Sequence, residues 1–305
     1  MKIRDFGVEI WMGLYENDCE YNLAETCVES LTVEQLLDYS GNKEEVIDEI
    51  LKMKLTYGAI EGSERFRKGI TTLYKNIDID NITVTHGAIG ANALSIMSLV
   101  EPGDRVISVL PTYQQHYSIP ESIGADVKIL KLKPENNFLP DLKELKSYIN
   151  DNTKLICINN PNNPTGALMD EEFLKNIVDI AKACGAYVLC DEVYRGLNHE
   201  GDMFTTSIAD LYEKGISTCS MTKTFSLAGL RLGWVVGPKD FIKGVNKQRD
   251  YHVISCPMID ERLACIALEN KEAILQRNHD IVKRNIKAES GYPSRLPLHR
   301  RENDR

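Results

Sequence analysis

Short apolar segments of strand length alternate with helix-length amphipathic segments along most of the chain, and this alternation restricts the fold more than any other feature. It predicts strands over 82–85, 105–110, 126–132, 154–160, 187–193, 217–221 and 231–237. It predicts helices over 42–53, 63–76, 141–149 and 170–183, with Ser63 as an N-cap, and an apolar helix that follows 86–90. Such an alternation predicts an α/β fold, with helices in layers around a mostly parallel sheet.

The charge of the chain argues against several classes of function. The 305 residues include 36 basic and 45 acidic side chains, a formal net charge of −9. This excess of acid argues against nucleic acid and against an anionic membrane surface as partners, because both attract basic faces. The longest apolar runs are strand-sized, and the first residues do not resemble a signal peptide. Eight scattered cysteines without a CxxC pair predict reduced thiols in a cytoplasmic protein, without a metal site.

Ligands of a parallel sheet bind beyond the carboxyl ends of its strands, and one loop at such a position carries a lysine. Lys223 follows an apolar strand, with Ser220 and Thr222 before it and Arg231 after it. A lysine that is partly removed from water there can form a Schiff base with an aldehyde. The two hydroxyls and the planar guanidinium suit a phosphate. A lone loop lysine is more often simply solvated, so this interpretation depends on the other loops.

Two more loops carry polar side chains directly after strands. Asp191 ends a very apolar strand, where a buried carboxylate needs a cation such as a protonated pyridine nitrogen. Tyr194 can donate a hydrogen bond to a phenolate oxygen. The alternative for Asp191 is a cap on the next helix. The string NNPNNPTG at 159–166 forms a rigid turn that can present the amide of Asn163 to a polar ring substituent.

A fourth segment joins a strand to the apolar helix through Gly87, Ala88 and Ile89. Free backbone N–H groups at a helix N-terminus bind phosphate, and glycine lets the backbone approach closely. Many strand-to-helix turns contain glycine, so this signal is weak alone. Tyr113, in the next loop that follows a strand, can stack on a flat heterocycle. The alternative is a partly buried surface tyrosine.

In this order and at this spacing, the segments resemble the class I/II aminotransferases of fold type I, which depend on pyridoxal 5′-phosphate (PLP). The resemblance runs from YGAIEG at 57–62 to about 237. It implies that Lys223 carries the Schiff base, that Asp191 pairs with the pyridine nitrogen, and that Asn163 and Tyr194 bind the 3′ oxygen. Tyr113 would stack on the ring. The phosphate would be held by the amides of Gly87, Ala88 and Ile89 and by the side chains of Ser220, Thr222 and Arg231.

The resemblance also implies a partner subunit. In this family the tyrosine that matches Tyr57 reaches the phosphate of the neighbouring subunit, so a homodimer with shared sites is expected. His86 and Cys190 lie beside the site in the sequence and are interpreted as packing residues.

Three regions are expected along the chain. Residues 1–40 would form an N-terminal arm that belongs to a small domain, residues 41–286 the PLP-binding large domain with the helix after it, and residues 287–305 a poorly ordered tail. Family members usually continue into a C-terminal small domain whose arginine binds the substrate carboxylate. The tail does not resemble that domain, which predicts a chain that lacks most of it. That arginine's role is therefore not transferred to Arg295, Arg300, Arg301 or Arg305.

The resulting hypothesis is a PLP-dependent aminotransferase that moves an amino group between an amino acid and a 2-oxo acid. Lys223, Asp191 and Tyr194 would be its catalytic residues, with Lys223 as the general base that removes the α-proton. Two alternatives stay open. The same cofactor supports elimination or decarboxylation, because the fold does not decide which bond is broken. A chain without most of the small domain can also be a PLP-binding remnant without turnover.

Overall fold

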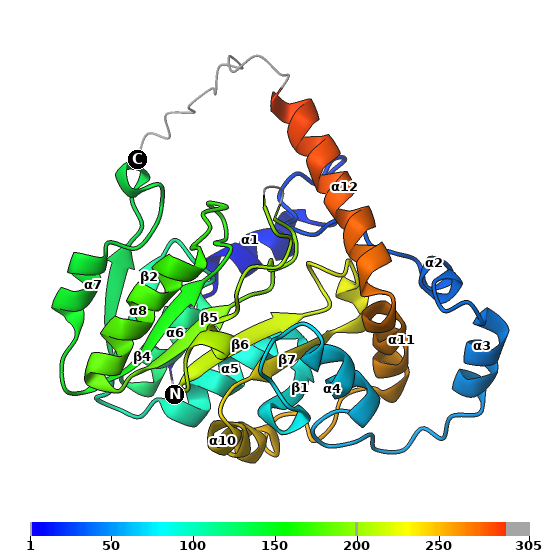
Figure 1. Ribbon diagram of the computed structural model, residues 1–305, viewed down its shortest axis with the longest axis horizontal. Helices are drawn as coiled ribbons and strands as arrows, with labels where there is room; N and C mark the ends of the chain where they lie inside the picture. The colour runs from blue at the N-terminus through cyan, green and yellow to red at the C-terminus, as the bar shows by residue number, and fades with distance from the viewer. Residues whose placement is uncertain (1, 199–200, 291–305) are drawn as a thin grey trace.

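The computed structural model describes residues 2–198 and 201–290, and within them the strands form one seven-stranded sheet (Figure 1). The strand order is β1-β7-β6-β5-β4-β2-β3. Neighbours from β3 through β2, β4 and β5 to β6 are parallel, whereas β7 runs antiparallel to both β6 and β1. The strands are β1 (Ile82–His86), β2 (Arg105–Leu110), β3 (Asp126–Lys131), β4 (Thr153–Asn159), β5 (Tyr187–Asp191), β6 (Gly215–Ser220) and β7 (Leu232–Val236).

Helices cover the sheet and extend beyond its β1 edge. At one end of the molecule lies α7, and at the opposite end lie α2 and α3 (Figure 1). The helices are α1 (Gly7–Tyr15), α2 (Val33–Asp38), α3 (Lys43–Leu51), α4 (Glu64–Thr71), α5 (Gly87–Leu99), α6 (Gln115–Ile123), α7 (Leu142–Tyr148), α8 (Glu171–Cys184), α9 (Ile208–Leu211), α10 (Lys239–Arg249), α11 (Met258–Glu269) and α12 (Lys271–Ser290).

The period-two pattern of the central strands determines the layers. In β4, Ile156 and Ile158 point into a cluster with α7 and α8. Leu155 and Cys157 point the other way, into a cluster with α5, α6 and α10. Because both faces are buried, these strands are apolar throughout. This confirms the predicted arrangement of helices in layers around a mostly parallel sheet, with one helical layer on each face.

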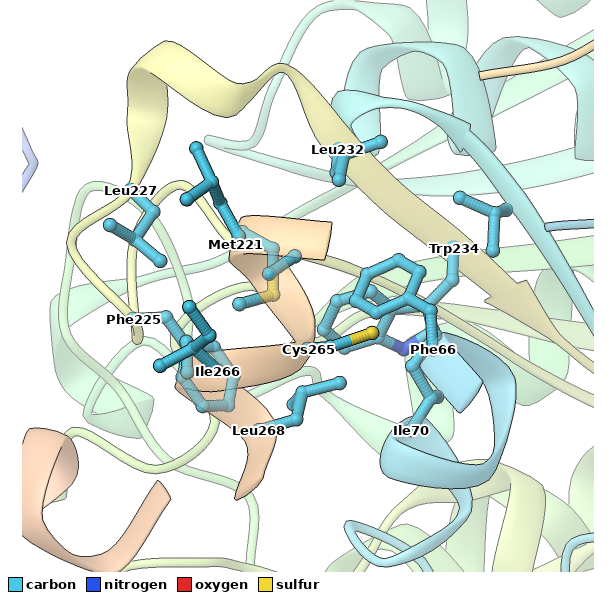
Figure 2. Close-up of a cluster of buried hydrophobic side chains, with 14 of the residues drawn as sticks. Phe66, Ile70, Met221, Phe225, Leu227, Leu232, Trp234, Cys265, Ile266 and Leu268 are labelled. Carbon is cyan, nitrogen blue, oxygen red and sulfur yellow. The ribbon is translucent and has the colours of Figure 1, made fainter. Parts of the chain in front are cut away.

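A third apolar cluster packs against strands β1 and β7 and supports the loop after β6. Phe66 of α4 contacts Trp234 of β7 edge to face, with ring centroids 6.3 Å apart (Figure 2). Met221 and Phe225 of the loop after β6 are buried in the same cluster, and α11 contributes three side chains that Figure 2 labels, Cys265, Ile266 and Leu268. Apolar packing therefore fixes the loop that carries Lys223 on both sides of that lysine.

Most predicted element boundaries lie within a few residues of the observed ones, but the helix predicted over 63–76 already ends at Thr71. All seven strands are confirmed, and the Ser63 side chain caps α4 by accepting a hydrogen bond from the Phe66 amide. The helix near the C-terminus continues to Ser290, so it includes the first residues of the region expected to be a disordered tail. The remainder of that region, residues 291–305 with its four arginines, lies outside the described residues.

The N-terminal region does not behave as one unit. Leu36 and Leu37 of α2 are buried in the same cluster as Phe66 and Trp234, whereas α1 has no buried residue. The eight cysteines are all free thiols. Within the described part of the chain, no helix is both long and apolar enough to cross a membrane.

Candidate cofactor site

The sheet topology brings the four predicted segments to one edge. The neighbouring parallel strands β4, β5 and β6 end at Asn159, Asp191 and Ser220. Strand β7 runs the opposite way, so its first residues lie at this edge too, and His86 at the end of β1 pairs with Leu232. Chain segments far apart in sequence therefore meet where the strands end, as predicted for ligand binding.

The amino end of α5 and Arg231 form a cradle for an anion. His86 precedes α5 without a side-chain capping bond, which leaves the first backbone N–H groups of this 13-residue helix available. Gly87 has a φ of 65°, and a Cβ atom on it would lie 3.0 Å from a guanidinium nitrogen of Arg231. Arg231 itself adopts a φ of 53°, a conformation that is costly outside glycine and concentrates at ligand sites. Ala88 and Ile89 continue the first turn of the helix.

Ser220 and Thr222 complete the loop between β6 and Lys223. The Ser220 hydroxyl accepts a hydrogen bond from the backbone N–H of Thr222 at 3.3 Å. Directly opposite, Ser220 pairs with Gly233 of β7, and a Cβ atom on Gly233 would lie 2.3 Å from the Gly87 carbonyl carbon. The absence of a side chain at Gly233 thus allows the amino end of α5 to come close to β7 at the point where β7 pairs with Ser220 of β6.

Asp191 is a buried carboxylate that no permanent cation neutralises within the described residues. One oxygen accepts a hydrogen bond from the Asn92 side-chain amide at 2.8 Å, and the other accepts one from the Val193 backbone at 3.2 Å. The nearest basic group is the imidazole Nε2 of His116, at 3.8 Å. Burial lowers the pKa of His116, so the imidazole is neutral near pH 7. The Val193 contact belongs to a turn and not to the helix cap considered as the alternative.

Lys223 and Tyr194 meet on a residue from the N-terminal segment. The amine of Lys223 donates to the hydroxyl of Thr26 at 2.9 Å and lies 3.3 Å from the sulfur of Cys27. The Tyr194 hydroxyl donates to the same Thr26 oxygen at 2.9 Å. Burial raises the pKa of Tyr194, and the nearby charge of Lys223 opposes this effect. Tyr194 therefore remains a protonated donor at neutral pH.

The turn that carries Asn163 is tied to the end of β5. The Asn163 backbone N–H donates to the side-chain oxygen of Asn159 at 2.5 Å, and the Asn159 amide donates to the Asp191 carbonyl at 2.8 Å. A cavity of about 460 Å³ opens beside this turn, a volume in the range of small-molecule sites. It is lined by Thr26, Pro161, Asn162, Asn163, Pro164, Gly166, Leu168, Tyr194, Leu197 and Asn198.

Two predicted residues lie at the margin of this arrangement. The Tyr113 ring packs on Phe6, with centroids 4.8 Å apart, and its hydroxyl donates to Glu9 at 2.7 Å. Burial, followed by the bond to Glu9, raises the Tyr113 pKa far above its usual value. Tyr57 lies in the irregular segment between α3 and α4 and is 77% exposed. Cys190 is buried in the core, whereas His86 is only half-buried.

Several residues at the site were not found from the sequence. Asn92 had a detectable signal, because it is a polar residue in an otherwise apolar helix. His116 could have been noticed because it lies in the first turn of α6, three residues after Tyr113. Thr26 and Cys27 carry no local signal, since their contact with Lys223 spans nearly 200 residues of chain.

Comparison with known proteins identifies the family to which this chain belongs. The model of the family "Aminotransferase class I and II" matches residues 9–289. An aspartate aminotransferase of Pyrococcus horikoshii is 35% identical over 70% of this chain and 56% of its own length. Capreomycidine synthase of Streptomyces vinaceus is 30% identical over 70% of this chain and 55% of its own. The chain thus spans just over half the length of the curated relatives it matches.

A solved structure matches a larger share of this chain than these two relatives do. The crystal structure of a PLP-dependent aminotransferase from Streptococcus suis superposes with a TM-score of 0.91 at 44% identity. The superposition covers 95% of this chain and 77% of that one. With its fold, its strand-end loops and a family match over most of its length, this chain belongs to the class I and II aminotransferase family.

Proposed function

We propose that this chain binds PLP at the strand-end site and transfers an amino group between an amino acid and a 2-oxo acid. The observation that carries the proposal is Asp191, a buried carboxylate without a permanent cation, at the same sheet edge as the amine of Lys223 and the uncapped start of α5. PLP offers a group for each of these three features: a basic ring nitrogen, an aldehyde and a phosphate. The family match supports the same cofactor.

The phosphate fits the cradle at α5. The free N–H groups of Gly87, Ala88 and Ile89 carry the positive end of the helix dipole, and Arg231 adds a planar fork that suits phosphate oxygens. The hydroxyls of Ser220 and Thr222 lie on the adjoining loop. These groups together would hold the phosphate.

The ring fits the space between Asp191 and the Asn163 turn. Asp191 would pair with the protonated ring nitrogen, which resolves the cost of a buried, uncompensated carboxylate. Tyr194 and Asn163 would donate to the oxygen on the opposite side of the ring. Tyr113 would stack on the ring face.

Residues of the chain have distinct roles in the proposed reaction. Bound PLP supplies an electron sink for the bond that breaks at the substrate α-carbon. Lys223 would anchor the cofactor and, through its Nζ atom, would act as the base that takes the proton from the substrate α-carbon. Thr26 accepts hydrogen bonds from both Lys223 and Tyr194 and so holds the two side chains at a fixed separation.

A half-reaction tests this function. The PLP-loaded protein is mixed with single amino acids, and the 2-oxo acid and the aminated cofactor are measured by mass spectrometry. We expect equal amounts of both products from the native protein, and a loss of at least about 1000-fold in rate in Lys223→Ala, since the base is gone. Lys214→Ala, at an exposed lysine bonded to the Gly185 carbonyl, is the matched control. A Lys223→Ala protein with the native rate would contradict the proposal.

A second candidate is a lyase-type reaction or decarboxylation with the same cofactor. It is kept because one relative, capreomycidine synthase, is named as a synthase and not as an aminotransferase, although it matches the same share of the chain as an aspartate aminotransferase does. Release of ammonia with a 2-oxo acid, or of carbon dioxide, without the aminated cofactor would select this candidate.

We also infer that the chain forms a homodimer in which Tyr57 reaches the phosphate of the neighbouring subunit. In the described part of the chain, 14 of the 19 exposed large hydrophobic side chains lie within residues 3–60, where Tyr57 is found. A surface this rich in apolar groups is typical of an interface.

Complementation tests this shared site. Tyr57→Ala and Lys223→Ala chains, each inactive alone, are mixed and allowed to exchange subunits. A shared site restores activity, because each mixed dimer has one site with both residues native. A mixture that stays inactive although mixed dimers form would contradict the role of Tyr57.

A further inference from the structure

Asn92 and Thr218 are buried polar residues for which the proposed function has no role. Their relative exposures are 1% and 0%. Asn92 lies in α5, whose other buried side chains are mostly apolar, and Thr218 lies in β6. A polar group in such a place costs free energy unless it is hydrogen-bonded, so the partners of these two residues show what they do.

The two side chains form a chain of hydrogen bonds that ends on Asp191. The Thr218 hydroxyl donates to the side-chain oxygen of Asn92 at 2.6 Å, and the Asn92 amide donates to Asp191 Oδ2 at 2.8 Å. An ionised carboxylate only accepts hydrogen bonds, so the amide must turn its NH₂ group toward Asp191. The Thr218 hydroxyl then satisfies the amide oxygen. This arrangement is complete when Asp191 is ionised.

The other groups around Asp191 leave its carboxylate able to accept a hydrogen bond from one more partner. The Val193 N–H occupies Oδ1, and the neutral His116 has its Nε2 atom 3.8 Å from Oδ2 without a hydrogen-bond partner. Each carboxylate oxygen has two acceptor sites, and each uses one of them on a donor of the chain.

We propose that Asn92, supported by Thr218, is a positioning residue that orients the Asp191 carboxylate toward the ring nitrogen of the cofactor. This inference rests on the proposed function. It gives α5 two tasks: its first turn binds the phosphate, and Asn92 in the second turn orients the carboxylate for the ring nitrogen. One rigid helix thus determines the distance between the groups that bind the two ends of the cofactor.

The test measures binding of two ligands to the apo-protein. One is PLP, and the other is its carbocyclic analogue, in which a C–H group replaces the ring nitrogen. We expect Asn92→Leu to weaken PLP binding about 10-fold or more, as for a lost hydrogen bond to a charged group, and to change binding of the analogue less than about 2-fold. Thr218→Val, which acts through Asn92, should weaken PLP binding about 3-fold. If Asn92→Leu does not fold, Thr218→Val carries the test.

Ser95→Ala is the matched control, because Ser95 is buried on the same helix and its hydroxyl has no hydrogen-bond partner. It should leave the affinity for both ligands unchanged. Equal loss of both ligands in Asn92→Leu would show a merely structural role and overturn the inference, as would unchanged PLP binding. Failure of the native protein to bind PLP would instead refute the proposed function.

Discussion

The strand-end edge of the sheet and the N-terminal segment both contact the candidate site, but they are held by different forces. Asp191, Asn92 and Thr218 are buried and bonded to one another. Thr26 and Glu9 reach Lys223 and Tyr113 through hydrogen bonds at the surface, and α1 has no buried residue. The sheet edge is therefore pre-organised by the fold, whereas the N-terminal segment is attached by a few contacts and should be separable from it.

The two tryptophans of the chain give the largest expected contrast between these regions. Trp234 is fully buried against Phe66 and donates to the Tyr74 hydroxyl at 3.0 Å, whereas Trp11 in α1 is half exposed. Trp234→Ala should lower the free energy of unfolding by about 3–5 kcal/mol, and Trp11→Ala by less than about 0.5 kcal/mol in dilute monomer. Urea unfolding measures both. Equal losses would show that α1 belongs to the core.

Thr26 tests whether the weakly held segment still matters for chemistry. Thr26→Val removes the oxygen that accepts from Lys223 and Tyr194 and should lower kcat about 3- to 10-fold, with unfolding unchanged. Thr26→Ser keeps the hydroxyl and should retain native turnover. A Thr26→Val protein with native kcat would mean that the N-terminal segment takes no part in the reaction.

His116, at the strand-end edge, should make the free energy of unfolding depend on pH. Burial lowers its pKa in the folded protein below the ordinary value of 6.5, so the unfolded chain binds the proton more readily. Stability is then fully present above about pH 6.5 and falls as the pH drops toward the folded pKa. His116→Gln should make the free energy of unfolding less steep in this window. His252→Gln, at an exposed loop position, should keep the native slope, and the same slope in both variants would contradict the assignment.

The smallest effect is expected at the contact between the two regions. Tyr113→Phe removes the hydrogen bond to Glu9 but keeps the ring that packs on Phe6. We expect faster proteolysis within residues 2–18 and a change in unfolding free energy below about 0.5 kcal/mol. A destabilisation of 2 kcal/mol or more would show that α1 and the sheet unfold together.

The sequence predicted the parts of the site that follow from local pattern. Asp191 and Lys223 were predicted as site residues because each lies at or just after the end of a strand, and the structure brings both to one edge of the sheet. The antiparallel direction of β7 had no local signal, and Pro120 inside α6 concealed that helix. Thr26 was missed because its contact with Lys223 depends on the path of the whole chain. Asn92 was missed because a single polar residue does not change the apolar pattern of α5.

The most direct test of the account is to locate the cofactor on the chain. PLP is added to the native protein, the adduct is reduced with borohydride, and the modified lysine is identified by peptide mass spectrometry. The account predicts stoichiometric labelling of Lys223 alone, with Asp191→Ala strongly reducing the labelling at limiting PLP. Labelling of another lysine, or no labelling of a folded protein, would contradict it.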